Sequence, residues 1–225
     1  MMSWGDYKVY FYKKRKHEDH SLYVLLTHTG TQFTTLIRQF TAAPYNHASL
    51  ALDAGLNDMF SFGRKQAAHP WVAGFVQEDV YDGTFSRYPD TECILLRIQV
   101  TRDIVERVNE TIDYFRLHQH RYRYNLMGLL GVLLHKSIEP DNAYFCSQFV
   151  ADVFKQSGYP LWERPSGLVT PNDFLVHPAF DYVYQGPLYD YPLLDRSRLI
   201  HNGFMPRAYT AVEGNYPAEQ PPVSV

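Results

Sequence analysis

The sequence predicts an α+β protein, in which strands and helices are mixed without the regular alternation of a parallel sheet. Two observations carry this prediction. Segments 22–27 and 92–100 are short apolar runs bounded by polar residues, which is typical of strands. Segments 101–117 and 142–158 instead repeat apolar residues at helical spacing. We find no internal repeat, and we expect one domain over 1–204 followed by a Pro-rich mobile tail over 205–225.

The first half of the chain predicts a β-hairpin. Apolar residues at helical spacing first predict a helix over 33–40. After a Pro-containing break, a strand begins at His47, and its alternate side chains point to opposite faces. Segment 58–65 follows a turn at Gly55 and Asn57, so we expect it to pair with the His47 strand.

The second half predicts mainly helices with clear ends. Thr101 caps a helix that runs to Leu117, and the block 125–135 predicts a largely buried helix. The helix within 142–158 ends at Gly158, a residue type that favours the left-handed conformation after a last helical turn. Thr170 begins another helix, with proline at its first position.

Composition limits the classes of function. With 45% hydrophobic and 20% charged residues, the 225-residue chain is typical of a globular protein. Its net charge of -3 argues against nucleic acid or an anionic membrane as partner, since both need a concentrated basic face. The high share of aromatic residues, 16%, favours amphipathic surfaces or grooves but does not indicate a particular ligand.

Neither a transmembrane segment nor an export signal is expected, because no apolar run has the required length. With only two cysteines, the chain predicts no disulfide framework, and we expect a reducing cytoplasm. We expect no cofactor and no metal. A site built from His17, Asp19 and His20 is the metal alternative, but its spacing is irregular. The oligomeric state is left open.

Cys146 lies at the first turn of its predicted helix, and two interpretations fit it. It shares a stripe with apolar residues, so it fits a packed core cysteine. The helix N-terminus also stabilises a negative charge and lowers the pKa of a thiol, so it fits a nucleophilic thiolate. Cys93 has only the first interpretation, because it lies mid-strand among apolar residues.

A thiolate nucleophile needs a histidine within hydrogen-bond reach. Among the ten histidines, most lie in polar or turn-like stretches. His47 alone begins an alternating strand directly after a Pro-containing loop, so it is the candidate partner of Cys146.

Three stretches together resemble a known superfamily: "PYNHASLALD", "YRYNLMGLLGV" and "YFCSQFVADVF". They are similar to the circularly permuted papain-like hydrolases of the NlpC-type superfamily, close to the YiiX-like proteins and more remotely to lecithin retinol acyltransferase. The permuted branch has its histidine strand before its cysteine helix, as here. The resemblance covers about 22–175, and "SFGRK", "AGFV" and "LVTP" are similar to a bacterial subgroup without an assigned substrate. It implies an antiparallel sheet or barrel packed on helices.

The resemblance also implies roles for residues. Cys146 matches the nucleophile and His47 the general base. Ser61 matches the position that orients the imidazole, although it lacks the charge of Asp or Glu and fits a structural hydroxyl equally well. The predicted cleft or oxyanion group comprises Tyr124, Ser147 and Gln148; Tyr124 also fits the core, and Gln148 also fits a helix cap.

The expected function is therefore that of a thiol hydrolase or acyltransferase, which acts on an amide, ester or thioester through a thioacyl intermediate. The substrate would be a small molecule, a peptide or a lipid-like acyl compound. The family's cell-wall enzymes carry Asp-Cys-Ser-Gly at the nucleophile, whereas this chain has Phe145-Cys146-Ser147-Gln148. The alternative is a papain-like binding protein with little or no turnover, which the absence of a charged partner for His47 favours.

Overall fold

The computed structural model describes residues 20–28, 44–64, 73–125 and 140–201, and within them the chain is α+β. Three predictions lie outside the described residues: the helix at 33–40, the tail over 205–225, and the helix at 125–135 apart from Asn125. The strands are β1 (His20–His28), β2 (His47–Ala51), β3 (Met59–Arg64), β4 (Ala73–Glu78), β5 (Glu92–Val100), β6 (Arg123–Tyr124), β7 (Ala143–Tyr144) and β8 (Phe180–Pro187). The α-helices are α2 (Arg102–Leu117), α4 (Cys146–Gln156), α5 (Pro171–Val176) and α6 (Arg196–His201).

Six strands form one sheet in the order β4-β3-β2-β1-β5-β8, and every neighbouring pair is antiparallel. The predicted strands at 22–27 and 92–100 are confirmed as β1 and β5, which are neighbours inside the sheet. The predicted hairpin is also confirmed, since β2 pairs with β3 through Leu50 opposite Phe60. β8 forms one edge of the sheet, although it lies beyond the segment 22–175 that carries the resemblance.

The predicted turn between β2 and β3 is confirmed, and the residue with a positive φ in it is Leu56 (58°). Leu56 is 1% exposed and packs in the core, while the carboxylate of Asp53 accepts hydrogen bonds from the backbone N–H groups of Asn57 and Asp58. Packing of the Leu56 side chain therefore offsets the conformational cost that a non-glycine residue has at this φ.

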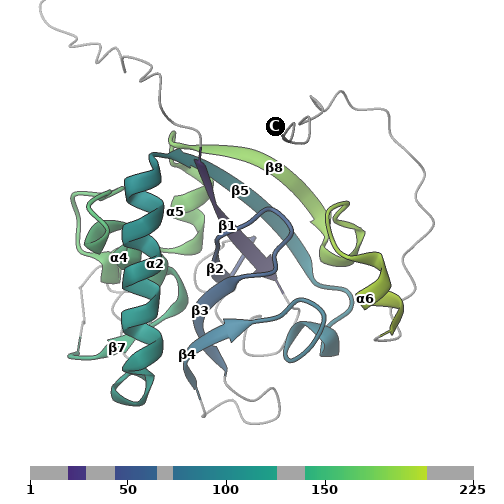
Figure 1. Cartoon of the computed structure of the whole chain (residues 1–225), viewed down its shortest axis with the longest axis horizontal. Coiled ribbons are helices and arrows are strands. Elements are labelled where there is room, and N and C mark those ends of the chain that lie inside the picture. Colours follow the sequence, from purple (N-terminus) through teal and green to yellow (C-terminus); the bar gives the residue numbers. More distant parts are fainter. Residues whose placement is uncertain (1–19, 29–43, 65–72, 126–139, 202–225) are drawn as a thin grey trace, which may run out of the picture.

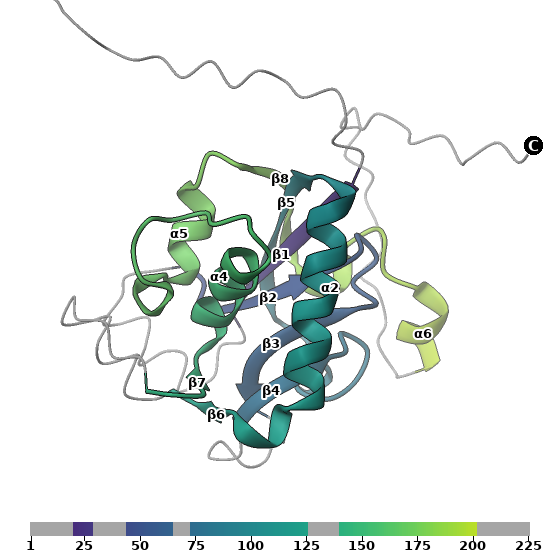
Figure 2. The same ribbon diagram turned by 60° about the vertical axis from the view of Figure 1, so that its left-hand side comes forward.

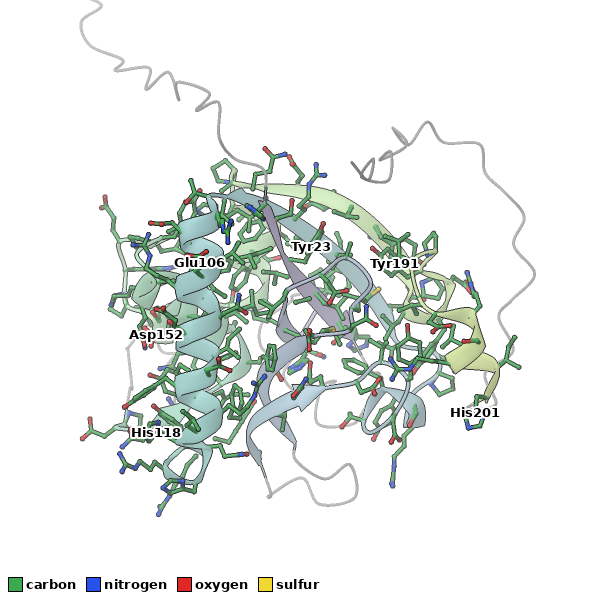
Figure 3. All side chains as sticks on the ribbon, in the orientation of Figure 1. Tyr23, Glu106, His118, Asp152, Tyr191 and His201 are labelled. Atoms are coloured by element: carbon green, nitrogen blue, oxygen red, sulfur yellow. The ribbon has the colours of Figure 1, made fainter. Side chains whose placement is uncertain are left out.

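The helices lie mainly on one side of the sheet. In Figure 1, α2, α4 and α5 lie together at one side, while α6 lies at the opposite side; Figure 2 shows α4 between α5 and α2. Figure 3 places Glu106 and Asp152 on the helical side and Tyr191 toward α6. Each side has its own core, because alternate residues of every strand point to opposite faces.

The core on the helical side is rich in aromatic rings that pack on one another. Phe149 of α4 contacts Phe62, Phe75 and Phe115 with ring centroids 5.3, 5.7 and 5.1 Å away. Tyr144 and Tyr122 join the same group. Much of the aromatic content therefore stabilises the core, so it does not by itself indicate a lipid-binding groove.

The predicted helix ends are confirmed where the structure describes them. Thr101 stands before α2 as predicted, but its side chain makes no capping hydrogen bond. Thr170 precedes α5, and its N–H and hydroxyl both donate to the carboxylate of Asp173. Gly158 follows α4 with φ +79°. Its N–H donates to the carbonyl of Lys155, and the next N–H, that of Tyr159, donates to Phe154, which is the Schellman pattern.

Candidate thiol site

The site begins where the short parallel pair β6 and β7 leads into α4. Phe145 adopts an extended conformation directly before the helix, and Cys146 is the first residue of α4. Gln148 caps the helix, since its Oε1 accepts from the backbone N–H of Phe145 at 3.4 Å and from Nδ2 of Asn125 at 3.4 Å. The cap fixes the first turn, and Cys146 is held there with 4% exposure.

The sulfur of Cys146 lies against the start of β2. The carbonyl of Asn46 is 4.0 Å from Sγ, and the backbone N–H groups of Ala48 and Ser147 donate to the sulfur. The imidazole of His47 also hydrogen-bonds to it. Burial raises the pKa of the thiol, but the hydrogen bond and positive charge of His47, aided by the two N–H groups, outweigh this effect, so the pKa is lowered.

His47 lies between the sulfur and a carboxylate. Its Nε2 is 2.8 Å from Oε1 of Glu78, which leaves Nδ1 as the nitrogen that meets the sulfur. Burial lowers the pKa of the imidazole, but the negative charge of Glu78 outweighs burial, and Cys146 adds to it, so that the pKa is raised to about 10. The imidazole is therefore charged at neutral pH, and its side chain is 21% exposed.

Glu78 is the acidic member of the site. Its Oε1 also accepts from the hydroxyl of Ser61 at 2.8 Å, and its Oε2 accepts from the hydroxyl of Ser49. Burial raises the pKa of this carboxyl, since the side chain is only 13% exposed, but the charge of His47 and the three hydrogen bonds outweigh burial and lower it. The carboxyl group is therefore ionised at neutral pH, and both of its oxygens accept hydrogen bonds.

The strand register explains how these residues meet. Ala51 of β2 is opposite Met59 of β3, and Met59 is opposite Glu78 of β4, so these three residues share one face of the sheet. His47 and Ser49 lie on this face by the period of two along β2, and Ser61 does so along β3. Gly63 lies beside the ring, because a Cβ built there would be 3.5 Å from Cε1 of His47.

Sequence reasoning missed Glu78 altogether. "AGFV" contributed only to the resemblance, and no strand was assigned to 73–78. The period of two along a strand was the available signal: Phe75 and Glu78 are three positions apart in β4, so they point to opposite faces, and Phe75 packs in the helical core. Register with β3 was also needed, and the sequence alone does not give it.

The other candidate residues take different positions. Ser61, which was predicted to orient the imidazole, donates its hydroxyl to Oε1 of Glu78 at 2.8 Å, and Glu78 is the residue that binds Nε2 of His47. The hydroxyl of Ser147 donates to the carbonyl of Val169 at 2.7 Å and ties the 3-10 segment Ser166–Leu168 to α4, so only its backbone N–H faces the sulfur. Gln148 serves as the helix cap. Tyr124 lies on β6 and packs on the helical core, and its place in a cleft stays a prediction.

Cys93 is a core residue, as predicted. It is 1% exposed and packs with Leu25 and Leu95 on the face of the sheet away from the main helices. Burial raises the pKa of its thiol far above the ordinary value. The two cysteines therefore have opposite ionisation properties, which makes Cys93 an internal reference for Cys146.

Metal and membrane features are limited to what the described segments contain. Those segments hold no group of three His, Cys, Asp or Glu side chains arranged to bind a metal ion. His17 and Asp19 of the alternative metal site lie outside them. Every helix in the described part of the chain is too short or too polar to cross a bilayer.

Fold and site together define an α+β protein with a Cys–His–Glu arrangement, in which a thiol at a helix N-terminus meets a strand histidine backed by a carboxylate. No family model matches the chain, and no curated protein matches it in sequence.

Proposed function

We propose that the protein is a cysteine-dependent hydrolase or acyltransferase with a permuted papain-like fold. The observation that carries this proposal is the position of His47, which contacts the sulfur of Cys146 on one side and the carboxylate of Glu78 on the other. A low-pKa thiol, an imidazolium and a buried carboxylate are the groups that nucleophilic thiol catalysis uses. The fold proposal is supported by the order of the histidine strand and cysteine helix and by the antiparallel sheet on which α4 packs.

The first half of the reaction forms a thioester. The Cys146 thiolate attacks the carbonyl carbon of an amide, ester or thioester, and the C–S bond forms as the carbonyl oxygen takes the negative charge. The backbone N–H groups at the start of α4 are suited to stabilise that oxyanion. The bond to the leaving group then breaks, and the leaving N, O or S atom takes the proton of the His47 imidazolium.

The second half releases the acyl group. Water or an acceptor nucleophile gives its proton to the neutral imidazole and attacks the thioester carbon, and the C–S bond breaks to restore the thiolate and the imidazolium. Glu78 holds Nε2 throughout and stabilises the charged ring, which is the part that an acidic third residue has in nucleophile–base–acid triads. Substrates of the predicted kind, small-molecule, peptide or lipid-like acyl compounds, fit this chemistry.

A papain-like binding protein is the second candidate. The 4% exposure of Cys146 favours it, because a substrate carbonyl must reach the sulfur. Glu78, however, supplies the charged partner of His47 whose absence from the sequence interpretation was the main argument for this candidate.

Labelling with iodoacetamide at pH 7, followed by mass spectrometry, tests the enzyme proposal. We expect Cys146 to react much faster than Cys93, and His47→Ala to slow its alkylation at least about 30-fold, because an ordinary thiol is only a few per cent ionised at this pH. Ser157→Ala is the matched control, since Ser157 is buried at the far end of α4.

Equal and slow labelling of both cysteines, unchanged by His47→Ala, would support binding alone. Incubation of the protein with acyl esters and thioesters adds a direct readout. An acyl adduct on Cys146 that decays in the wild type and persists in Glu78→Gln or His47→Ala would support turnover, and no adduct with any class of ester would count against it.

A further inference from the structure

The Glu78 carboxylate has more partners than a simple Glu–His pair requires. Oε1 is shared between Nε2 of His47 and the hydroxyl of Ser61, each at 2.8 Å. Oε2 accepts from the hydroxyl of Ser49. Both oxygens are therefore engaged, and rotation of the carboxylate about its terminal bond would break at least one of these contacts.

The two serines come from different strands and serve the same carboxylate. Ser49 lies two residues after His47 on β2, and Ser61 lies on β3, between β2 and the β4 strand that carries Glu78. Both are 0% exposed, so water does not replace their hydroxyls. Both hydroxyls donate hydrogen bonds to Glu78, and hydroxyl donors of this kind favour the ionised form of a carboxyl group.

We propose that Ser49 and Ser61 are positioning residues, which keep Glu78 ionised with Oε1 directed at His47 and thereby keep the imidazolium–thiolate pair present under mildly acidic conditions. This inference rests on the proposed function. The serines do not touch the sulfur or a substrate; they act through Glu78 and then through His47. Such an arrangement extends the acidic end of the pH range in which the thiolate exists.

Titratable groups lie near this carboxylate on β2, on α4 and next to it in the chain. His47 faces it from β2, and Cys146 lies behind the imidazole at the start of α4. Asp79, the next residue after Glu78, directs its Oδ2 to Arg198 of α6 at 2.9 Å. Protonation of Glu78 at low pH would remove the negative charge that holds the imidazolium, and the thiolate would then be lost with it.

The test measures the rate of Cys146 alkylation by iodoacetamide from pH 4 to pH 9 in the full-length protein. In the wild type, we expect the alkylation rate to fall at low pH, and we call this part of the pH–rate curve the acidic limb. In Ser49→Ala and in Ser61→Ala, its midpoint should move upward by roughly one pH unit, with the rate above that limb close to wild type. Ser157→Ala is the control, because this equally buried serine contacts Thr111 at 3.3 Å and lies away from Glu78. Ser49→Thr keeps a hydroxyl and should restore the midpoint.

A double-variant cycle isolates the path through the carboxylate. In a Glu78→Gln background, Ser49→Ala should move the limb no further, since no charge remains for the hydroxyl to stabilise. An unmoved limb in both serine variants, or an equal shift in the Glu78→Gln background, would overturn the inference. Failure of the proposed function looks different: Cys146 would label as slowly as Cys93 in the wild type, before any serine is changed.

Discussion

The carboxylate of Glu78 and the imidazole of His47 lie 2.8 Å apart, although 31 positions separate them in the chain. The two side chains are 13% and 21% exposed, so their charges interact with little screening by water. This pair raises the pKa of His47 to about 10 against the effect of burial, and the resulting imidazolium lowers the pKa of Cys146. The ionisation of the thiol thus depends on a residue that does not touch it.

Glu78→Gln should bring the pKa of His47 down from about 10 toward its ordinary value of 6.5. The amide keeps the size of the side chain but not the charge that outweighs burial. We expect the imidazole to be protonated at pH 8 in the wild type and neutral in the variant. A pH titration of the His47 Cε1–H signal by NMR, assigned by comparison with His47→Ala, measures this. Identical titration curves for both proteins would contradict the role assigned to Glu78.

Cys146→Ser should make stability fall as pH rises above 6.5. Between pH 6.5 and 9, the native wild-type pair holds one proton on the imidazole, and the unfolded pair holds one on the thiol, so the pair adds no pH dependence. Without the thiol, only the raising effect of Glu78 on the pKa of His47 remains, and the stability that it provides is lost progressively as the pH rises above 6.5.

Urea unfolding at pH 6.5, 7.5 and 8.5 measures this difference. The gap in unfolding free energy between wild type and Cys146→Ser should widen with pH, by at most about 1.4 kcal/mol per unit. Parallel stability curves for the two proteins would show that the native pair is not ionic in this range.

Gln148→Ala should destabilise the protein by about 1 kcal/mol, because the buried N–H of Phe145 and the amide of Asn125 lose their acceptor. Gln148→Glu keeps an acceptor oxygen and should retain most of this stability. Thermal or urea unfolding gives the measurement. If instead Gln148→Ala leaves stability unchanged but lowers turnover of an identified ester about a hundredfold, the side chain is an oxyanion donor and not a cap.

Gly158→Ala should cost about 1–2 kcal/mol of unfolding free energy, since a side chain disfavours its φ of +79°. The added Cβ would be 3.7 Å from the guanidinium carbon of Arg107, an ordinary contact, so the cost lies in the backbone. Gly83→Ala is the matched comparison, with φ +71° and nothing within 4 Å of the added Cβ. A loss several times larger for Gly158 than for Gly83 would indicate a steric clash instead.

Local patterns predicted four strands of the six-stranded sheet and three of the four α-helices that the structure describes, but not β4, β8 or α6. The strands around 22–27 and 92–100, the hairpin from His47 and the helix from Thr101 all depend on periodicity and on residues close in sequence. The end of α4 before Gly158 was equally predictable from the sequence, because the left-handed residue that follows a last helical turn is a local requirement. The turn between β2 and β3 was less predictable in detail. Tertiary packing of Leu56, and not the glycine beside it, decides which residue has the positive φ.

The sequence by itself determined the two ends of the proposed reaction site, since a cysteine at a helix start and a histidine at a strand start are local features. Only the tertiary structure decided which group stands behind the histidine. Glu78 meets His47 because two antiparallel registers, β2 with β3 and β3 with β4, bring their side chains to one face of the sheet. A shift of one residue in either register would turn that carboxylate to the opposite face, and the residue pattern of β4 by itself does not show how this strand pairs with β3.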